Sequence, residues 1–124
     1  MPENNRLPHS HHSKEEEKRI LGILPDDEQV YAVAEAMKQL GDPSRLRIFW
    51  LLCHTEECVI NIAALVKMSS PAVSHHLRLL KAAGLIVSKR EGKEMYYRAS
   101  KTTLVLRLHG TIEAIAEISC PDEK

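Results

Sequence analysis

The chain has few aromatic residues, and this limits the kind of core it can build. One Trp, one Phe and three Tyr occur in 124 residues, so the interior must be filled chiefly by Leu, Ile, Val and Ala. Aliphatic side chains of this kind pack well between helices, and a chain of this length suffices for one domain with a modest core. We therefore expect a mainly α-helical fold rather than a β-sandwich.

Several other features are also missing. No apolar run approaches the roughly 20 residues of a membrane-spanning helix, and no secretory signal peptide is present. The three cysteines, Cys53, Cys58 and Cys120, are an odd number and widely spaced, which argues against a disulfide framework. We expect a cytoplasmic protein with reduced thiols and no membrane partner. The sequence also lacks His-Glu-x-x-His, a Gly-rich phosphate loop and Gly-x-Ser-x-Gly, so we expect no enzyme.

The charges cancel over the whole chain but not along it. Seventeen basic and seventeen acidic residues give no net charge, yet residues 69–101 hold seven cations against two acids. Residues 1–28 show the reverse, with seven acids against four cations. A local basic patch is typical of a surface that contacts phosphate, and it makes double-stranded DNA a candidate partner.

The stretch Ser69–Lys81 is predicted to be an amphipathic helix. Ser70 suits the N-cap and Pro71 the first helical position, while Gly84 ends the helix. An apolar stripe recurs at helical spacing: Val73, Leu77 and Leu80. The other face holds small, imidazole and cationic side chains, namely Ala72, Ser74, His75, Arg78 and Lys81. Such a face fits the major groove of DNA.

The flanking segments complete a winged helix-turn-helix. Helices are expected over 14–24, 28–40 and 43–53, and Val59-Ile60 is expected to lead into a further short helix with Asn61 as its N-cap. Residues 67–69 then make the tight turn before the helix that would read DNA. The β-prone runs 86–90 and 95–98 predict a hairpin, a wing whose tip carries Arg90 and Lys93.

The last predicted helix, about 101–118, is too apolar to stand alone. Leu104, Leu108, Ile112 and Ile115 lie along one side of it. We therefore expect a homodimer through the first and last helices. The expected organisation is an N-terminal arm over 1–26 that bears His9, His11 and His12, a DNA-binding and dimerisation domain over 27–118, and a tail over 119–124.

From Val30 to Glu117 the chain resembles the ArsR/SmtB family of bacterial metal-sensing winged-helix repressors. The resemblance rests on Leu-Gly-Asp-Pro-Ser-Arg-Leu-Arg-Ile (40–48), Ser-Pro-Ala-Val-Ser-His-His-Leu (70–77), Gly-Leu-Ile-Val (84–87), Arg-Glu-Gly-Lys (90–93) and Tyr96-Tyr97. It implies a homodimer that binds an inverted-repeat operator and releases it when a metal ion of the zinc or cadmium type binds. It places the DNA contacts on Ser70, Ala72, Ser74, His75 and Arg78 of the helix and on Arg90 and Lys93 of the wing. His76 is expected to support the helix against the wing instead.

The metal site that the resemblance implies is only partly kept. Of the family's Glu-Leu-Cys-Val-Cys-Asp-Leu box, Cys58 keeps the first cysteine, whereas Ile60 and Asn61 replace the second cysteine and the acid. Thiolate and imidazole suit Zn²⁺, so we expect a site made by Cys58 with His9, His11 and His12, which could come from the other subunit's arm. A second family site on the last helix would fall on Lys101, Thr103, Ala114 and Glu117, where three of the four ligands are missing.

Two alternatives stay open. Cys53 and Cys120 could make a switch that responds to thiol oxidants or reactive sulfur, although the cysteines of such relatives match Trp50 and Ala116 here. The chain could also be a DNA-binding regulator without an effector. Deletion of residues 1–13 would spare a dithiol switch and remove an arm-dependent metal site.

Overall fold

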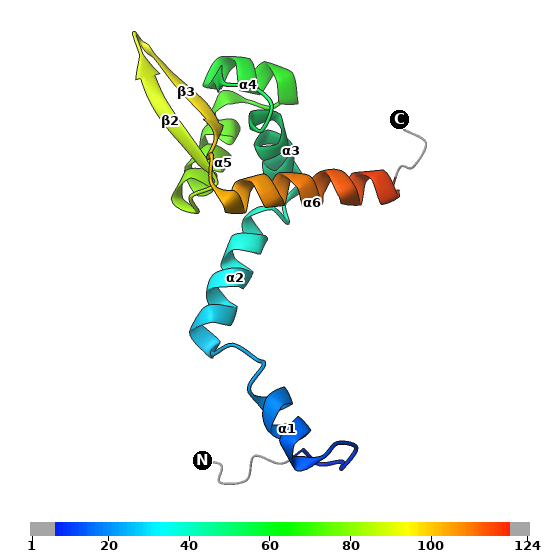
Figure 1. The fold of residues 1–124 in the computed structure, drawn as a ribbon. Helices are drawn as coiled ribbons and strands as arrows, with labels where there is room; N and C mark the ends of the chain where they lie inside the picture. The colour runs from blue at the N-terminus through cyan, green and yellow to red at the C-terminus, as the bar shows by residue number, and fades with distance from the viewer. Residues whose placement is uncertain (1–6, 120–124) are drawn as a thin grey trace. The chain divides into compact units, whose positions relative to one another are not determined.

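The computed structural model of the chain describes residues 7–119 and separates into two units, Met1–Glu35 and Ala36–Lys124 (Figure 1). In the first unit, α1 (Lys14–Leu21) begins with a capping box. The Ser13 hydroxyl accepts from the Glu16 backbone N–H, and the Glu16 carboxylate accepts from the Ser13 backbone N–H. Helix α2 (Asp27–Gln39) starts in this unit and ends in the second.

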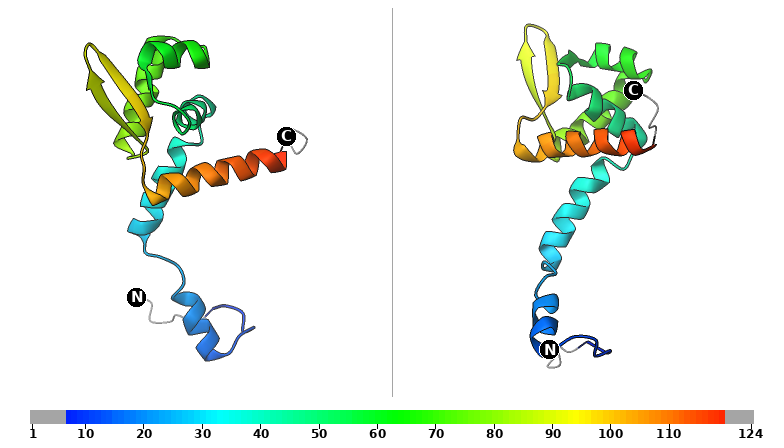
Figure 2. Two further views of the ribbon diagram at one scale, coloured as in Figure 1. Left: turned by 45° about the horizontal axis from the view of Figure 1, so that its top comes forward. Right: turned by 45° about the vertical axis from the view of Figure 1, so that its right-hand side comes forward.

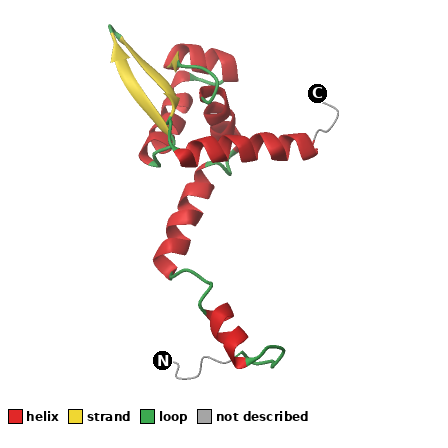
Figure 3. Ribbon diagram, in the orientation of Figure 1, coloured by secondary structure: helices red, strands yellow, loops and turns green. Residues whose placement is uncertain are grey.

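The second unit is mainly helical with a small antiparallel sheet (Figure 3). Its elements after α2 are α3 (Pro43–Leu52), β1 (Glu57–Cys58), α4 (Val59–Val66), α5 (Ser70–Ala82), β2 (Ile86–Glu91), β3 (Glu94–Ala99) and α6 (Thr103–Ser119). The strand order is β1-β3-β2, and Tyr97 of β3 stands between Glu57 and Ser88. This arrangement confirms the predicted winged helix-turn-helix. Strand β1 was not predicted, because two residues are too few to show an alternating pattern.

The core of this unit is aliphatic, as the composition requires. Ile48 and Phe49 of α3, Ile62 of α4 and Leu80 of α5 are fully buried. Val73 and Leu77 of α5 join them, which confirms the predicted apolar stripe. Because α5 buries this stripe against α3 and α4, its opposite face is left on the surface.

Two predicted helix caps are displaced in the structure. Ser69 rather than Ser70 is the N-cap of α5, and its hydroxyl accepts from the backbone N–H of Ala72 at 3.2 Å. Two serines in a row offer equivalent caps, and the sequence pattern does not distinguish them. Helix α4 begins at Val59, directly after Cys58 in the chain, so Asn61 lies inside the helix. The Asn61 side chain donates to the Glu57 carboxylate at 3.0 Å.

The end of α5 sets the base of the wing. Gly84 adopts a φ of +79°, and the N–H groups of Gly84 and Leu85 donate to Lys81 and Leu80 in a Schellman motif. The buried Ser100, which follows β3, donates its hydroxyl to the Gly84 carbonyl at 2.9 Å. Its backbone N–H donates to the Leu85 carbonyl. The wing is thereby tied to the end of the helix at both strands.

The apolar residues of α6 do not form a single buried stripe. Val105 is buried, and Leu108 and Ile112 pack against the core. Leu104, Leu106, Ile115 and Ile118 are 53–79% exposed. The predicted stripe is therefore divided between the core of the unit and its surface. Within residues 7–119, no helix is long and apolar enough to cross a membrane.

Candidate nucleic-acid interface and metal-ligating residues

Helices α4 and α5 form the helix-turn-helix, and the turn between them is tight. Lys67 ends α4 in the left-handed region, with φ 58° and ψ 50°, and Ser69 already caps α5. Only Met68 separates these two positions. The short turn therefore fixes the orientation of α5 on α4.

The residues expected to contact DNA lie on two neighbouring elements of the second unit. All of them are exposed except the half-buried Ala72; they are Ser70, Ala72, Ser74, His75 and Arg78 on α5 and Arg90 and Lys93 on the hairpin. The Arg78 guanidinium lies 3.2 Å from Nδ1 of His75, one turn earlier on α5. Hydroxyl, imidazole and guanidinium groups on one exposed helix face can donate to base edges and phosphates.

The hairpin projects away from the helices, which brings its tip into solvent (Figure 2). Gly92 occupies the first loop position with a φ of +63°, and its carbonyl accepts from the Arg90 guanidinium at 3.4 Å. The Lys81 ammonium of α5 donates to the Ser88 hydroxyl of β2 at 2.7 Å. The helix and the hairpin are thus linked by a side-chain bond, and their cations lie on exposed surface.

His76 braces α5 against α3. Its Nδ1 accepts from Nε of Arg45 at 3.3 Å, and the Arg45 guanidinium also donates to the Gln39 carbonyl. Burial lowers the pKa of His76, against the opposing charge of Asp42. A neutral ring is what the Arg45 donor requires, because a doubly protonated imidazole has no acceptor. His76 therefore supports α5, as predicted, but the side chain it bonds is Arg45 of α3 and not a residue of the wing.

The residues of the sequence-predicted metal site fall in both units. Cys58 is buried at the end of β1, where it precedes α4. In the arm, the rings of His9 and His11 stack with centroids 5.6 Å apart, and His12 lies 3.5 Å from the Glu16 carboxylate. The arm histidines belong to the first unit and Cys58 to the second, so their meeting stays a prediction.

Of the two cysteines expected in a thiol switch, only Cys53 lies within residues 7–119; Cys120 is outside the described residues. Cys53 is half-buried at the end of α3. Burial, with the negative charge of Glu113, raises the pKa of Cys53 to about 11. A thiol in this state is a poor nucleophile at neutral pH, because the thiolate is the reactive form.

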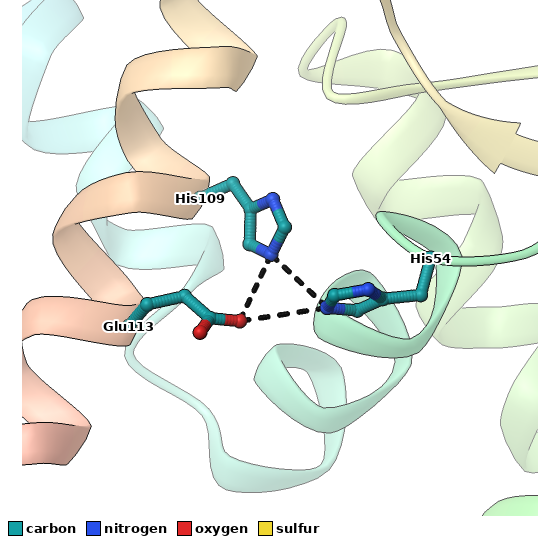
Figure 4. A group of neighbouring side chains, drawn as sticks. All are labelled: His54, His109 and Glu113. Atoms are coloured by element: carbon teal, nitrogen blue, oxygen red, sulfur yellow. Dashed lines mark hydrogen bonds and ion pairs between the residues drawn. The ribbon is translucent and has the colours of Figure 1, made fainter.

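A group of potential metal ligands that the sequence analysis missed lies where the end of α3 meets α6. His109 and Glu113 come from α6, and His54 follows α3 (Figure 4). The His and Glu at positions i and i+4 of one helix were the available signal. The sequence held no signal for His54, since it lies 55 residues from His109 and only the fold brings the two together.

The comparisons with known proteins agree with this geometry. Residues 42–88 match the family model described as bacterial regulatory protein, arsR family. The chain is 43% identical over 70 residues to a transcriptional repressor SmtB homolog of Synechocystis, a match covering 56% of this chain and 53% of that one. It is 41% identical over 66 residues to a cadmium resistance transcriptional regulatory protein CadC homolog of Staphylococcus aureus, covering 52% and 54%. The matches thus span about half of these relatives' lengths.

A solved structure extends the likeness over most of the fold. The homodimeric winged helix-turn-helix DNA-binding domain of a possible ArsR-family regulator from Mycobacterium bovis is 32% identical. It covers 76% of this chain and 89% of its own, with a TM-score of 0.66. All of these relatives are named as regulators or DNA-binding proteins, in agreement with the missing catalytic motifs.

Proposed function

Because the chain belongs to the ArsR family of bacterial regulatory proteins, we propose that it is a transcriptional repressor that binds operator DNA as a homodimer. It would act in the cytoplasm, where its operator is located. The observation that supports this most directly is the exposed polar face of α5, which stands beside a basic hairpin and is braced by α3. Ser70, Ser74, His75 and Arg78 would read the major groove, Ala72 would meet a thymine methyl, and Arg90 and Lys93 would contact the backbone or minor groove.

The exposed apolar face of α6 supports the homodimer. Leu104, Ile115 and Ile118 are large apolar side chains on one side of α6 that the second unit leaves uncovered. An isologous two-fold contact would bury this face against its copy. The two α5 helices would then lie about one helical turn of DNA apart, on an inverted repeat.

DNA binding is tested by fluorescence anisotropy with inverted-repeat sites selected from random duplexes. We expect Arg78→Ala to weaken binding by about 10- to 100-fold and to relax the base preference at one position. Lys93→Ala should weaken all sequences alike and lower the salt slope by about one. Arg19→Ala removes an exposed arginine of α1 and is the matched control. Equal binding by wild type and Arg78→Ala would contradict the assignment of α5 as the reading helix.

The proposed effector is a metal ion of the zinc or cadmium type. The cadmium-resistance relative supports this chemistry, and so does the thiolate and imidazole set of Cys58 with His9, His11 and His12. Zinc should weaken operator binding by wild type, and Cys58→Ser or deletion of residues 1–13 should reduce that response. If both variants respond to zinc as wild type does, the Cys58 site is wrong. A response to an oxidant that persists in the deletion variant would favour the thiol alternative.

A further inference from the structure

Three ligand atoms converge where α3 ends against α6. The Nε2 atoms of His54 and His109 lie 3.1 Å apart. Oε2 of Glu113 lies 3.1 Å from Nε2 of His109 and 3.4 Å from that of His54. Figure 4 shows the two rings pointing at each other and at one carboxylate oxygen, so the three atoms form a nearly equilateral triangle.

These separations match the spacing of ligands around one tetrahedral ion. Zn²⁺ binds imidazole nitrogen and carboxylate oxygen at about 2.0–2.1 Å, which sets neighbouring ligand atoms about 3.3–3.4 Å apart. An ion above the triangle can therefore reach all three atoms with small side-chain rotations. We propose that His54, His109 and Glu113 form a binding site for a divalent cation of the zinc class.

The donor atoms have the chemistry that this site needs. A metal takes the lone pairs of both Nε2 atoms when each ring keeps its proton on Nδ1. His109 is one-quarter exposed, whereas His54 and Glu113 are about half exposed, which leaves the fourth vertex open to water. Three protein ligands and a water are a common zinc set.

Trp50 holds the carboxylate in place. Its indole N–H donates to Oε2 of Glu113 at 2.9 Å, the same oxygen that faces the two histidines. This bond, with those to His109 and His54, holds the pKa of Glu113 below its ordinary value. Outer contacts of this kind orient a metal ligand. Trp50 is also the single tryptophan of the chain, so its fluorescence reports on the site.

The site contains no thiolate and lies on different elements from Cys58. It joins α3 to α6, and the Arg45 end of α3 contacts His76 behind the reading helix. A metal that ties α6 to the end of α3 would therefore act on the reading helix and on the apolar face of α6 together. This regulatory role rests on the proposed function, whereas metal binding itself does not.

The test is a titration of the full chain with Zn²⁺ followed by calorimetry and Trp50 fluorescence. Co²⁺ serves as a second probe, because a thiolate ligand adds a charge-transfer absorption that a site of two histidines and one glutamate lacks. The variants are His109→Gln, His54→Gln and Glu113→Gln. Glu117→Gln removes the same charge one turn further along α6 and is the matched control.

Zinc should bind with a change in Trp50 fluorescence, and His109→Gln and Glu113→Gln should weaken that binding by at least about 100-fold. Glu117→Gln should bind as wild type does. The proposal is overturned if zinc does not bind, if the three variants bind with wild-type affinity, or if bound Co²⁺ shows only thiolate absorption. Operator affinity is measured separately without metal, so failure of DNA binding counts against the proposed function and not against this site.

Discussion

Some side chains of this protein hold the proposed DNA-binding helix in place without being proposed DNA contacts themselves. The bond from Arg45 to His76 is an example, since neither side chain is among the proposed DNA contacts, yet together they connect α3 to α5. Asp42 belongs to the same group. As N-cap of α3 it accepts from the Arg45 backbone N–H, which lowers the pKa of Asp42, and its charge also acts on His76.

His76 makes a pH dependence testable. Its folded pKa is lowered by burial, so the unfolded chain binds the proton more tightly. The stability that neutral His76 contributes is fully present above the unfolded pKa of about 6.5, and it is lost as pH falls through the folded pKa. Urea unfolding of metal-free protein between pH 5 and 8 should show stability falling toward pH 5. His76→Gln keeps a polar side chain without the titration, so its profile should be flatter, and an unchanged profile would contradict this role.

His75 is the matched control for that measurement. It is the neighbouring histidine, it is exposed, and its ring contacts Arg78 on its own helix rather than Arg45. The charged or titratable groups that act on His76 are Asp42, Arg45 and His75. His75→Gln should therefore alter the stability profile less than His76→Gln.

At the scale of elements, the joint between α5 and the wing depends on the backbone of Gly84. A Cβ at Gly84 would meet no atom within 4 Å, so the cost of a side chain there comes from the positive φ alone. The Ser100 hydroxyl and the Leu85 carbonyl complete the joint and hold β2 and β3 to the helix end.

Gly84→Ala should destabilise the protein by about 1–2 kcal/mol, the cost of a left-handed conformation for a residue with Cβ. Thermal or urea unfolding measures it. Gly84→Asn is the matched variant, because asparagine tolerates this conformation better, and its loss should be smaller. Equal losses for alanine and asparagine would show that something other than φ sets the cost.

At the scale of the whole molecule, α6 carries apolar residues both against the core and on the surface. Val105, Leu108 and Ile112 pack on the core of the second unit, while Leu104, Leu106, Ile115 and Ile118 are left exposed. His109 and Glu113 lie on the same helix. The proposed dimer contact and the proposed metal site would therefore be carried by one rigid element.

Ile115→Glu should shift the protein toward monomer, because a charge would be buried in the proposed two-fold contact without a partner. We expect the dimer dissociation constant, measured by sedimentation, to rise at least about tenfold, which corresponds to about 1.4 kcal/mol. Operator affinity should fall with it. Glu117→Lys changes an exposed charge on another side of α6 and is the control. A dimer unaffected by Ile115→Glu would place the interface elsewhere.

The amino-acid sequence by itself determined the winged helix-turn-helix. Helical spacing of Val73, Leu77 and Leu80, the glycine after α5 and the two β-prone runs of the hairpin are local signals, and each is confirmed. Tertiary structure decided what depends on residues far apart in the chain. It paired β1 with β3, divided the apolar surface of α6 between core and solvent, and brought His54 within 3.1 Å of His109. Such pairs leave no mark in the spacing of residues, since a contact across 55 positions arises only when α3 and α6 pack.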